Sequence, residues 1–156
     1  MHRNALRFLE SARELGVEVE LHEFPESTHT AADAAAAIGV PVGAIVKSLV
    51  FGVDDTLVVA LVSGSNQLDE ARLAAAAGGK VARRVDAETV RNATGYPVGG
   101  VPPFGHDGDL AVFVDEDLLD QPVVWAAAGT PNVNFCLPAD TLVRAARGTV
   151  VALRRG

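Results

Sequence analysis

The chain has 156 residues, the length of one domain, and we expect a single unit over residues 1–156. Hydrophobic residues make up 49% of it and charged residues 21%, which excludes an intrinsically disordered chain. The net charge of −7 argues against broad, nonspecific binding to nucleic acid such as DNA, and no apolar run reaches the roughly 20 residues of a membrane span. We therefore expect a cytoplasmic protein with neither DNA nor a membrane as partner.

The first half of the chain alternates between helical and extended patterns. Apolar residues recur at helical spacing or alternate with polar ones, and glycine or proline closes most segments. Thr28 or Thr30 can cap the second of the predicted helices. In chain order we expect a helix over residues 4–15, a strand over 17–21, a helix over 31–38, strands over 44–53 and 57–63, and a helix over 69–77.

The second half contains a long segment rich in glycine and proline, which predicts a loop over residues 94–108. Around it we expect a short strand near Val81, a helix over 87–93, strands over 110–114, 123–127 and 133–137, a helix over 139–146 and a strand over 149–153. Adjacent strands and interspersed helices together predict an α/β (α+β) fold with a mixed, partly antiparallel sheet. The GxGxxG and Walker patterns are absent from the sequence, which disfavours a nucleotide cofactor.

Lys47 is the only charged residue between Asp33 and Asp54, and it lies inside an apolar predicted strand. Burying an unpaired ammonium is unfavourable, so such a lysine needs a reason to be there. One interpretation is a functional site, because perturbed ionisable groups concentrate at sites. The other is structural: the stem packs while the ammonium reaches the sheet edge or a carboxylate such as Asp115.

The loop over residues 94–108 contains adjacent glycines, Gly99 and Gly100, followed by two prolines. Adjacent glycines let a backbone approach a ligand closely and direct N–H groups at an oxyanion. A rigid surface turn is the alternative, but about fifteen residues without a regular element favour a binding loop. His106, in the same loop, is either a donor to a phosphate or carbonyl or a solvated loop residue.

Two further positions follow predicted core strands. Ser63 and Gly64 either meet a ligand with their hydroxyl and amides or form a plain turn. Asp115 either faces the same cleft or caps the next helix. The single cysteine and the scattered histidines have no metal-ligand spacing, so we expect no metal and no cofactor. A side-chain nucleophile is not expected either, since no Ser-His-Asp or Cys-His arrangement is visible.

These segments, in this order, resemble the YbaK family and the editing insertion domain of bacterial prolyl-tRNA synthetases. The resemblance spans most of the chain. It is carried by the threonines before the alanine-rich helix, by IVKSLVF around Lys47, by LVSGSNQLD over 61–69, by TGYPVGGVPPFGH over 94–106, by VFVDEDL with Asp115 and by WAAAGT with Gly129.

The resemblance implies a mixed α/β domain that hydrolyses, in trans, the ester between a wrong amino acid and the 3′ adenosine of tRNA, typically tRNA for proline. Lys47 and the loop Gly99–Pro103 would surround the ester, and a water assisted by the substrate's 2′-hydroxyl would attack it. Lys47, Gly99 and Gly100 are then the expected catalytic residues. The expected substrate contacts are Phe24, Thr30, Ser63, Gly64, Val101, Pro103, Gly105, His106, Asp115 and Gly129.

Two departures bear on the substrate. Cysteine-directed relatives carry a hydroxyl residue before the late-loop glycine, whereas alanines precede Gly129 here, and Phe24 stands where a tyrosine occurs. The chain is thus more similar to the prolyl-type branch, with alanine, serine, threonine and a non-protein amino acid as candidate substrates. Prolyl-tRNA synthetase is the candidate partner. The alternatives are a non-catalytic module that binds aminoacyl-tRNA or a synthetase, and a small-molecule hydrolase or binder unrelated to translation. Lys47 and the double glycine disfavour the first.

Overall fold

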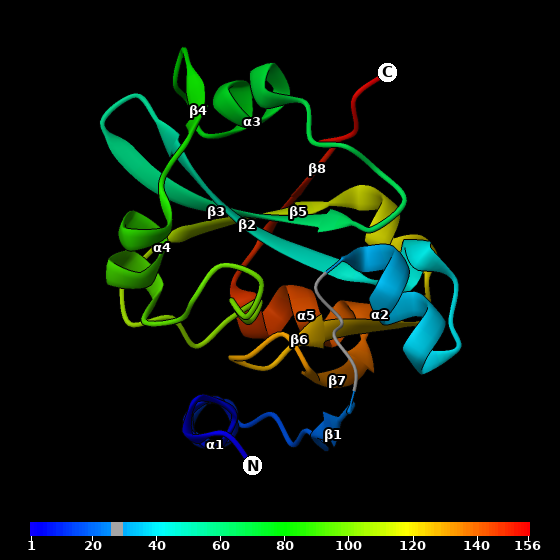
Figure 1. Ribbon diagram of the computed structural model, residues 1–156. Coiled ribbons are helices and arrows are strands. Elements are labelled where there is room, and N and C mark those ends of the chain that lie inside the picture. Colours follow the sequence, from blue (N-terminus) through cyan, green and yellow to red (C-terminus); the bar gives the residue numbers. More distant parts are fainter. Residues whose placement is uncertain (26–29) are drawn as a thin grey trace.

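The computed structural model describes residues 1–25 and 30–156, which form two β-sheets with helices around them (Figure 1). The helices are α1 (Arg3–Glu14), α2 (Ala31–Ile38), α3 (Glu70–Ala76), α4 (Ala87–Thr94) and α5 (Ala139–Ala146), with 3-10 turns η1 (Val42–Ala44) and η2 (Glu116–Asp120). The strands are β1 (His22–Glu23), β2 (Val46–Val53), β3 (Thr56–Ser63), β4 (Ala82–Arg84), β5 (Ala111–Asp115), β6 (Val123–Ala127), β7 (Val133–Pro138) and β8 (Thr149–Val151).

The larger sheet has five strands in the order β4-β2-β3-β5-β8. Strands β2 and β3 form an antiparallel hairpin, β4 adds antiparallel to β2, and β5 and β8 add in parallel beyond β3. The hairpin turns at Asp54 and Asp55, where Asp54 takes a left-handed conformation that aspartate tolerates. The Asp54 carboxylate also accepts hydrogen bonds from the amides of Lys80 and Val81, so the hairpin turn fixes the start of β4.

The smaller sheet has three antiparallel strands in the order β1-β7-β6. An isolated bridge between Ile45 and Trp125 links it to the start of β2. In Figure 1, α3 lies on one side of the larger sheet, while α5 and the smaller sheet lie on the other. The side chains of the larger sheet therefore contribute to two buried clusters, one on each face.

The helix ends follow the residues that favour them. Thr30, Asp69 and Asp86 cap α2, α3 and α4, and each side-chain oxygen accepts from the amide three residues later. Gly39 and Gly95 end α2 and α4 in the left-handed conformation, where glycine has no steric penalty. These caps confirm the sequence-based boundaries of the helices to within one or two residues.

The fold class is confirmed: the structure is a mixed α+β arrangement with antiparallel and parallel strand pairs. The strand predicted over residues 17–21 is wrong, because in the described structure only His22 and Glu23 pair with β7. Val17, Val19 and Leu21 still pack against the core, which explains their alternating pattern without a ladder. Thr28, one of the two predicted caps, lies outside the described residues. None of the described helices combines the length and apolarity that crossing a bilayer requires.

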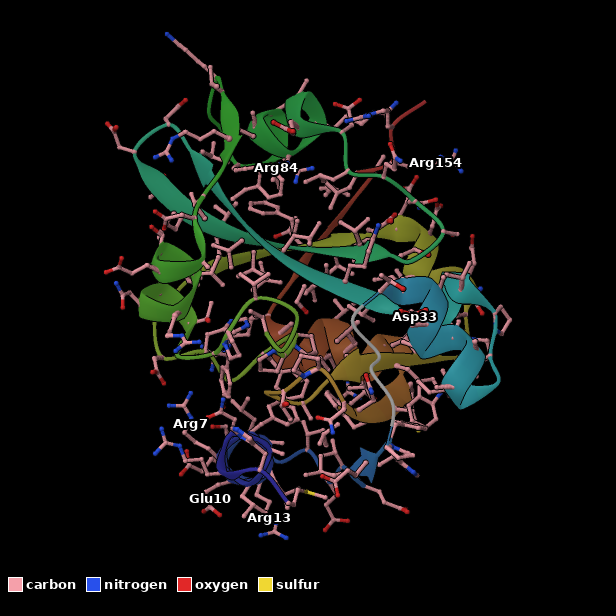
Figure 2. The ribbon with its side chains drawn as sticks, in the orientation of Figure 1. Arg7, Glu10, Arg13, Asp33, Arg84 and Arg154 are labelled. Carbon is pink, nitrogen blue, oxygen red and sulfur yellow. The ribbon has the colours of Figure 1, made fainter. Side chains whose placement is uncertain are left out.

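Helix α1 is amphipathic and closes one side of the core. Phe8 is fully buried, with ring centroids 5.3 Å from Phe104 and 4.8 Å from Phe135. Glu10 and Arg13 extend away from the sheets on the opposite face of the helix (Figure 2). Because Phe104 belongs to the glycine-rich loop and Phe135 to β7, one aromatic side chain joins three parts of the chain that are distant in sequence.

Replacing Phe8 by alanine should destabilise the protein by about 3–5 kcal/mol, the usual effect of truncating a buried phenylalanine. Leu6 lies on the same helix with 52% of its surface exposed, so Leu6→Ala should change the unfolding free energy little. Chemical denaturation of the two variants beside the parent measures the difference. Equal, small effects would show that α1 is not an integral part of the core.

Candidate functional site

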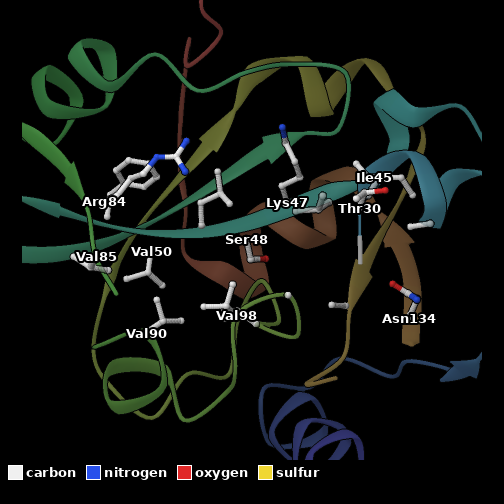
Figure 3. A pocket seen from close by; sticks show the side chains of 18 residues that line it. Thr30, Ile45, Lys47, Ser48, Val50, Arg84, Val85, Val90, Val98 and Asn134 are labelled. Carbon is white, nitrogen blue, oxygen red and sulfur yellow. The ribbon is translucent and has the colours of Figure 1, made fainter. Parts of the chain in front are cut away.

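A pocket of about 560 Å³ opens along the edge of β2, on the side away from β3. The six consecutive residues Val46–Phe51 line it, so the pocket follows the strand edge and receives side chains from both strand faces. Lys47 points to one face and Ser48 to the other (Figure 3). Residues from α2, β4, β6, β7 and the glycine-rich loop complete the walls.

The β2 edge is accessible because its pairing on this side is interrupted. In the described residues β4 pairs with Phe51–Val53 alone, and the Ile45–Trp125 bridge lies at the other end of the strand. The stretch Val46–Val50 between them has β3 as its strand partner and the pocket on its other side. An exposed edge presents main-chain donors and acceptors that a ligand can use.

Lys47 is half-buried, and its Nζ donates a hydrogen bond to the main-chain oxygen of Asn66 at 2.5 Å. Burial lowers the pKa of Lys47, and the negative charge of Asp115 offsets part of this effect. The site thus disfavours the ammonium relative to water, although one carbonyl and one carboxylate compensate in part. A lysine in this state is a functional candidate rather than a stabilising surface charge.

Asp115 is completely buried and fully engaged with its own chain. Its carboxylate accepts from the amide of Ser63 at 3.0 Å, from the Nδ2 of Asn66 at 2.9 Å and from the amide of Asp117 at 3.0 Å. The last of these is the capping contact that the sequence allowed. Asp115 holds in place the segment whose carbonyl receives Lys47, and it does not line the pocket.

Of the two adjacent glycines, Gly99 lines the pocket and Gly100 does not. Gly99 has a φ of +85°, and a Cβ there would meet nothing closer than a Pro131 carbon at 3.7 Å. Gly100 is buried, its amide donates to the Pro97 carbonyl, and a Cβ would come within 2.9 Å of the main chain at Gly129. Gly100 is therefore required by close packing, whereas Gly99 forms the accessible wall.

The remaining predicted residues divide between the pocket and its support. Thr30 and Val101 line the pocket together with Lys47 and Gly99. Gly129 supports it from behind, with a φ of +96° and a carbonyl that accepts from the Asn4 side chain. The others that lie outside the pocket lining are Phe24, Ser63, Gly64, Pro103, Gly105, His106 and Asp115.

Several of these outer residues have identifiable structural roles. The Ser63 hydroxyl donates to the Gly43 carbonyl at 2.8 Å, and the Gly64 amide donates to the Ile45 carbonyl at 2.7 Å, which anchors the turn after β3. The His106 Nε2 lies 2.7 Å from the Pro102 oxygen, and burial lowers the pKa of this histidine. His106 therefore braces the glycine-rich loop rather than remaining solvated.

Three polar residues of the pocket were not identified from the sequence: Ser48, Arg84 and Asn134. Ser48 is a hydroxyl residue next to Lys47 within an apolar strand, and this polar position is visible in the sequence. Arg84 is exposed on β4 at the end of the pocket away from Thr30 (Figure 3). Asn134 is a buried amide within the predicted strand of β7, and its polarity in an apolar run was a second available signal.

Within residues 1–25 and 30–156, no cluster of three or more His, Cys, Asp or Glu side chains is arranged to hold a metal ion. The chemistry of the pocket, as far as it is described, consists of one lysine, one arginine, hydroxyl and amide side chains, and main-chain groups on an apolar background.

Comparison with known proteins places this geometry among editing domains. Residues 25–145 match the family model of the aminoacyl-tRNA editing domain. The Bacillus subtilis (strain 168) protein YwhH is 34% identical over 74% of this chain and 73% of its own length. The proline--tRNA ligase of Nitratidesulfovibrio vulgaris (strain Hildenborough) is 38% identical over 58% of this chain, which corresponds to 16% of the ligase.

A solved structure agrees over the whole chain. It is described as a "putative trans-editing enzyme for prolyl tRNA synthetase", is 40% identical, and superposes with a TM-score of 0.95 over 100% of this chain and 99% of its own. The family model covers the β2 pocket, the glycine-rich loop and Asp115, the three features described above. The chain belongs to the aminoacyl-tRNA editing domain family.

Proposed function

We propose that this chain is an aminoacyl-tRNA deacylase that hydrolyses the ester of mischarged tRNA in trans, with tRNA for proline as the substrate. The observation that carries this proposal is the pocket along the β2 edge, where Lys47, Gly99 and Val101 line one cavity. The likeness to a prolyl-tRNA ligase segment and to a structure described as trans-editing supports the choice of tRNA. Prolyl-tRNA synthetase is the corresponding candidate partner.

The charge of the pocket suits the 3′ end of tRNA. Lys47 and Arg84 are its two cationic residues, and the strand face of Ser48 is lined by valines such as Val90 and Val98. A nucleotide ester has both an anionic phosphate and apolar faces on its base. A cavity with cationic and apolar parts can bind both, even though the chain as a whole carries a charge of −7.

The hydrolysis requires stabilisation of charge on the ester carbonyl oxygen. Among the described residues, the amides of Gly99 and Val101 have no hydrogen-bond partner in the protein, and both residues line the pocket. These amides and the Lys47 ammonium are the proposed donors to the developing oxyanion. Water adds to the carbonyl carbon, the bond to the ribose 3′-oxygen breaks, and that oxygen takes the proton, releasing free amino acid and tRNA.

The proposed role of the substrate's 2′-hydroxyl follows from what the pocket contains. Within the described lining there is no histidine, aspartate or glutamate to act as a general base. The vicinal 2′-hydroxyl lies next to the scissile ester in every aminoacyl-adenosine and can orient the attacking water. The proposed mechanism therefore combines protein donors with a hydroxyl of the substrate.

The direct experiment is deacylation of purified alanyl-, seryl-, threonyl- and cysteinyl-tRNA for proline by the parent and Lys47→Met. One placed donor is typically worth about 10²- to 10³-fold in rate, so Lys47→Met should lose activity by this factor. It should fold at least as well as the parent, because burial already disfavours the Lys47 ammonium. Lys47→Arg should not restore activity, since a planar fork does not replace a compact ammonium.

Lys80 provides the matched control, because it is the other lysine of the chain and is exposed outside the pocket. Lys80→Met should deacylate like the parent. Binding of mischarged tRNA without turnover by the parent would instead identify a non-catalytic binding module. A fully active Lys47→Met protein would remove Lys47 from the mechanism.

A mischarged tRNA that ends in 2′-deoxyadenosine should bind to the parent protein but turn over poorly. Without the 2′-hydroxyl the attacking water loses its proposed positioning group, while the phosphate and base contacts remain. Competition against the normal substrate measures binding, and release of labelled amino acid measures turnover. Rapid cleavage of the deoxy substrate would refute assistance by the 2′-hydroxyl.

The deacylation rate should also fall as the pH rises, and this fall should begin at a lower pH than the ordinary pKa of a lysine. Burial lowers the pKa of Lys47, so the active ammonium is present at lower pH and is lost as the pH rises through this lowered value. The measurement is kcat/KM against pH, corrected for spontaneous ester hydrolysis at each pH. A rate that stays level up to the ordinary pKa of lysine would contradict a role for the ammonium.

A further inference from the structure

The open stretch of β2 presents a defined set of main-chain groups to the pocket, and the register identifies them. The Asp54 amide donates to Val81 beside β4, and the Ile45 carbonyl accepts from Gly64 on the β3 side. Main-chain groups of successive strand residues point alternately to the two neighbouring strands. Residues of the same parity as Asp54 therefore face away from β3. Within the open stretch these are Val46, Ser48 and Val50, and Val46 lies next to the Ile45–Trp125 bridge.

Ser48 lies in the middle of the open stretch Val46–Val50. In the described part of the chain, the main chain of Ser48 has no strand partner on the pocket side. On the opposite side, β3 pairs with β2 along the whole hairpin. Ser48 itself lines the pocket. It thus offers one N–H donor and one C=O acceptor side by side, the pair that an antiparallel strand partner would use.

The aminoacyl group of the proposed substrate has the complementary pair. Its amino nitrogen is a donor and its ester carbonyl is an acceptor, separated by one α-carbon as in a residue of a β-strand. Resting on the proposed function, we propose that the aminoacyl group docks on β2 as a single-residue antiparallel strand. Its amino group donates to the Ser48 carbonyl, and its carbonyl accepts from the Ser48 amide.

This docking fixes the direction of the substrate. An antiparallel partner runs against β2, so the ester oxygen and the nucleotide extend toward the Lys47 end of the pocket, and the amino group lies toward Val50. Opposed residues of an antiparallel pair place their side chains on the same face. The side chain of the bound L-amino acid therefore lies beside Ser48, on the face toward Val98 (Figure 3).

A parallel arrangement would use different groups. A residue bound in parallel would donate to the Ser48 carbonyl and accept from the Val50 amide, and its nucleotide would extend toward Arg84. The antiparallel arrangement is preferred because it brings the ester to Lys47, which is half-buried and held by the Asn66 carbonyl, whereas Arg84 is exposed. The two arrangements differ in which amide they need, Ser48 or Val50.

The first test uses the parent protein with two chemically acylated tRNAs, alanyl-tRNA and propionyl-tRNA, which differ by the amino group alone. Each enzymatic rate is divided by the spontaneous hydrolysis rate of the same ester. Propionyl-tRNA should show an acceleration about 10- to 100-fold smaller, the effect of losing one hydrogen bond from a charged donor. Equal accelerations would overturn the docking while leaving the deacylase function intact, whereas no hydrolysis of either ester would count against the function itself.

The second test compares Ser48→Pro with Val50→Pro. Both prolines remove an N–H that faces the pocket and leave the hydrogen bonds to β3 in place, as an edge position allows. Antiparallel docking predicts a greater loss of kcat/KM on alanyl-tRNA in Ser48→Pro. A greater loss in Val50→Pro would overturn it. Melting midpoints verify that both variants fold. If one of them does not fold, the comparison of alanyl-tRNA with propionyl-tRNA on the parent protein decides whether the docking is correct.

Discussion

The structure depends on strand β2, which is paired along its whole length on one side and only near its ends on the other. Strand β4 is short and reaches Phe51, and the smaller sheet makes contact at Ile45. A longer β4 would fill the intervening edge and eliminate the pocket. The Asp54 carboxylate, which holds the amides before β4, sets where that strand begins. The cavity thus originates in strand length and not in a gap between domains.

A buried carboxylate, that of Asp115, lies close enough to Lys47 for its charge to act on the ammonium. The Asp115 carboxylate is fully enclosed, yet three donors satisfy it, so its burial is compensated. Through Asn66 this carboxylate orients the carbonyl that receives the Lys47 Nζ. The Lys47 ammonium is therefore partly desolvated and donates to one neutral oxygen, that of Asn66. Binding an incoming anion would stabilise this ammonium more than the neutral oxygen does. Asp115 is therefore a positioning residue in this interpretation, and its own contacts are with the protein.

The sequence predicted most of the fold because local signals were strong. Caps such as Thr30 and Asp86 define helix starts, and the two apolar runs of the β2–β3 hairpin read as core strands. The strand predicted over residues 17–21 is absent from the described structure, because side chains can alternate between buried and exposed positions in a segment that does not pair with another strand. Within the site, Lys47 and Gly99 line the pocket, whereas Gly100 and Asp115 lie outside its lining, and the functional roles expected of these residues stay predictions. Arg84 was missed because only the folded chain brings β4 to the β2 edge, whereas Asn134 was missed although its polarity within an apolar run is visible in the sequence.

The walls of the pocket are held by a helix that precedes the family match. Residues 25–145 carry the editing-domain similarity, yet α1 contacts both loops that adjoin the site. The Asn4 side chain donates to the Gly129 carbonyl, and Phe8 packs against Phe104 in the glycine-rich loop. Gly129 in turn leaves no room for a Cβ at Gly100. Because Gly99 precedes this tightly packed residue, the position of its amide depends on contacts that begin in α1, so the helix contributes to the pocket without lining it.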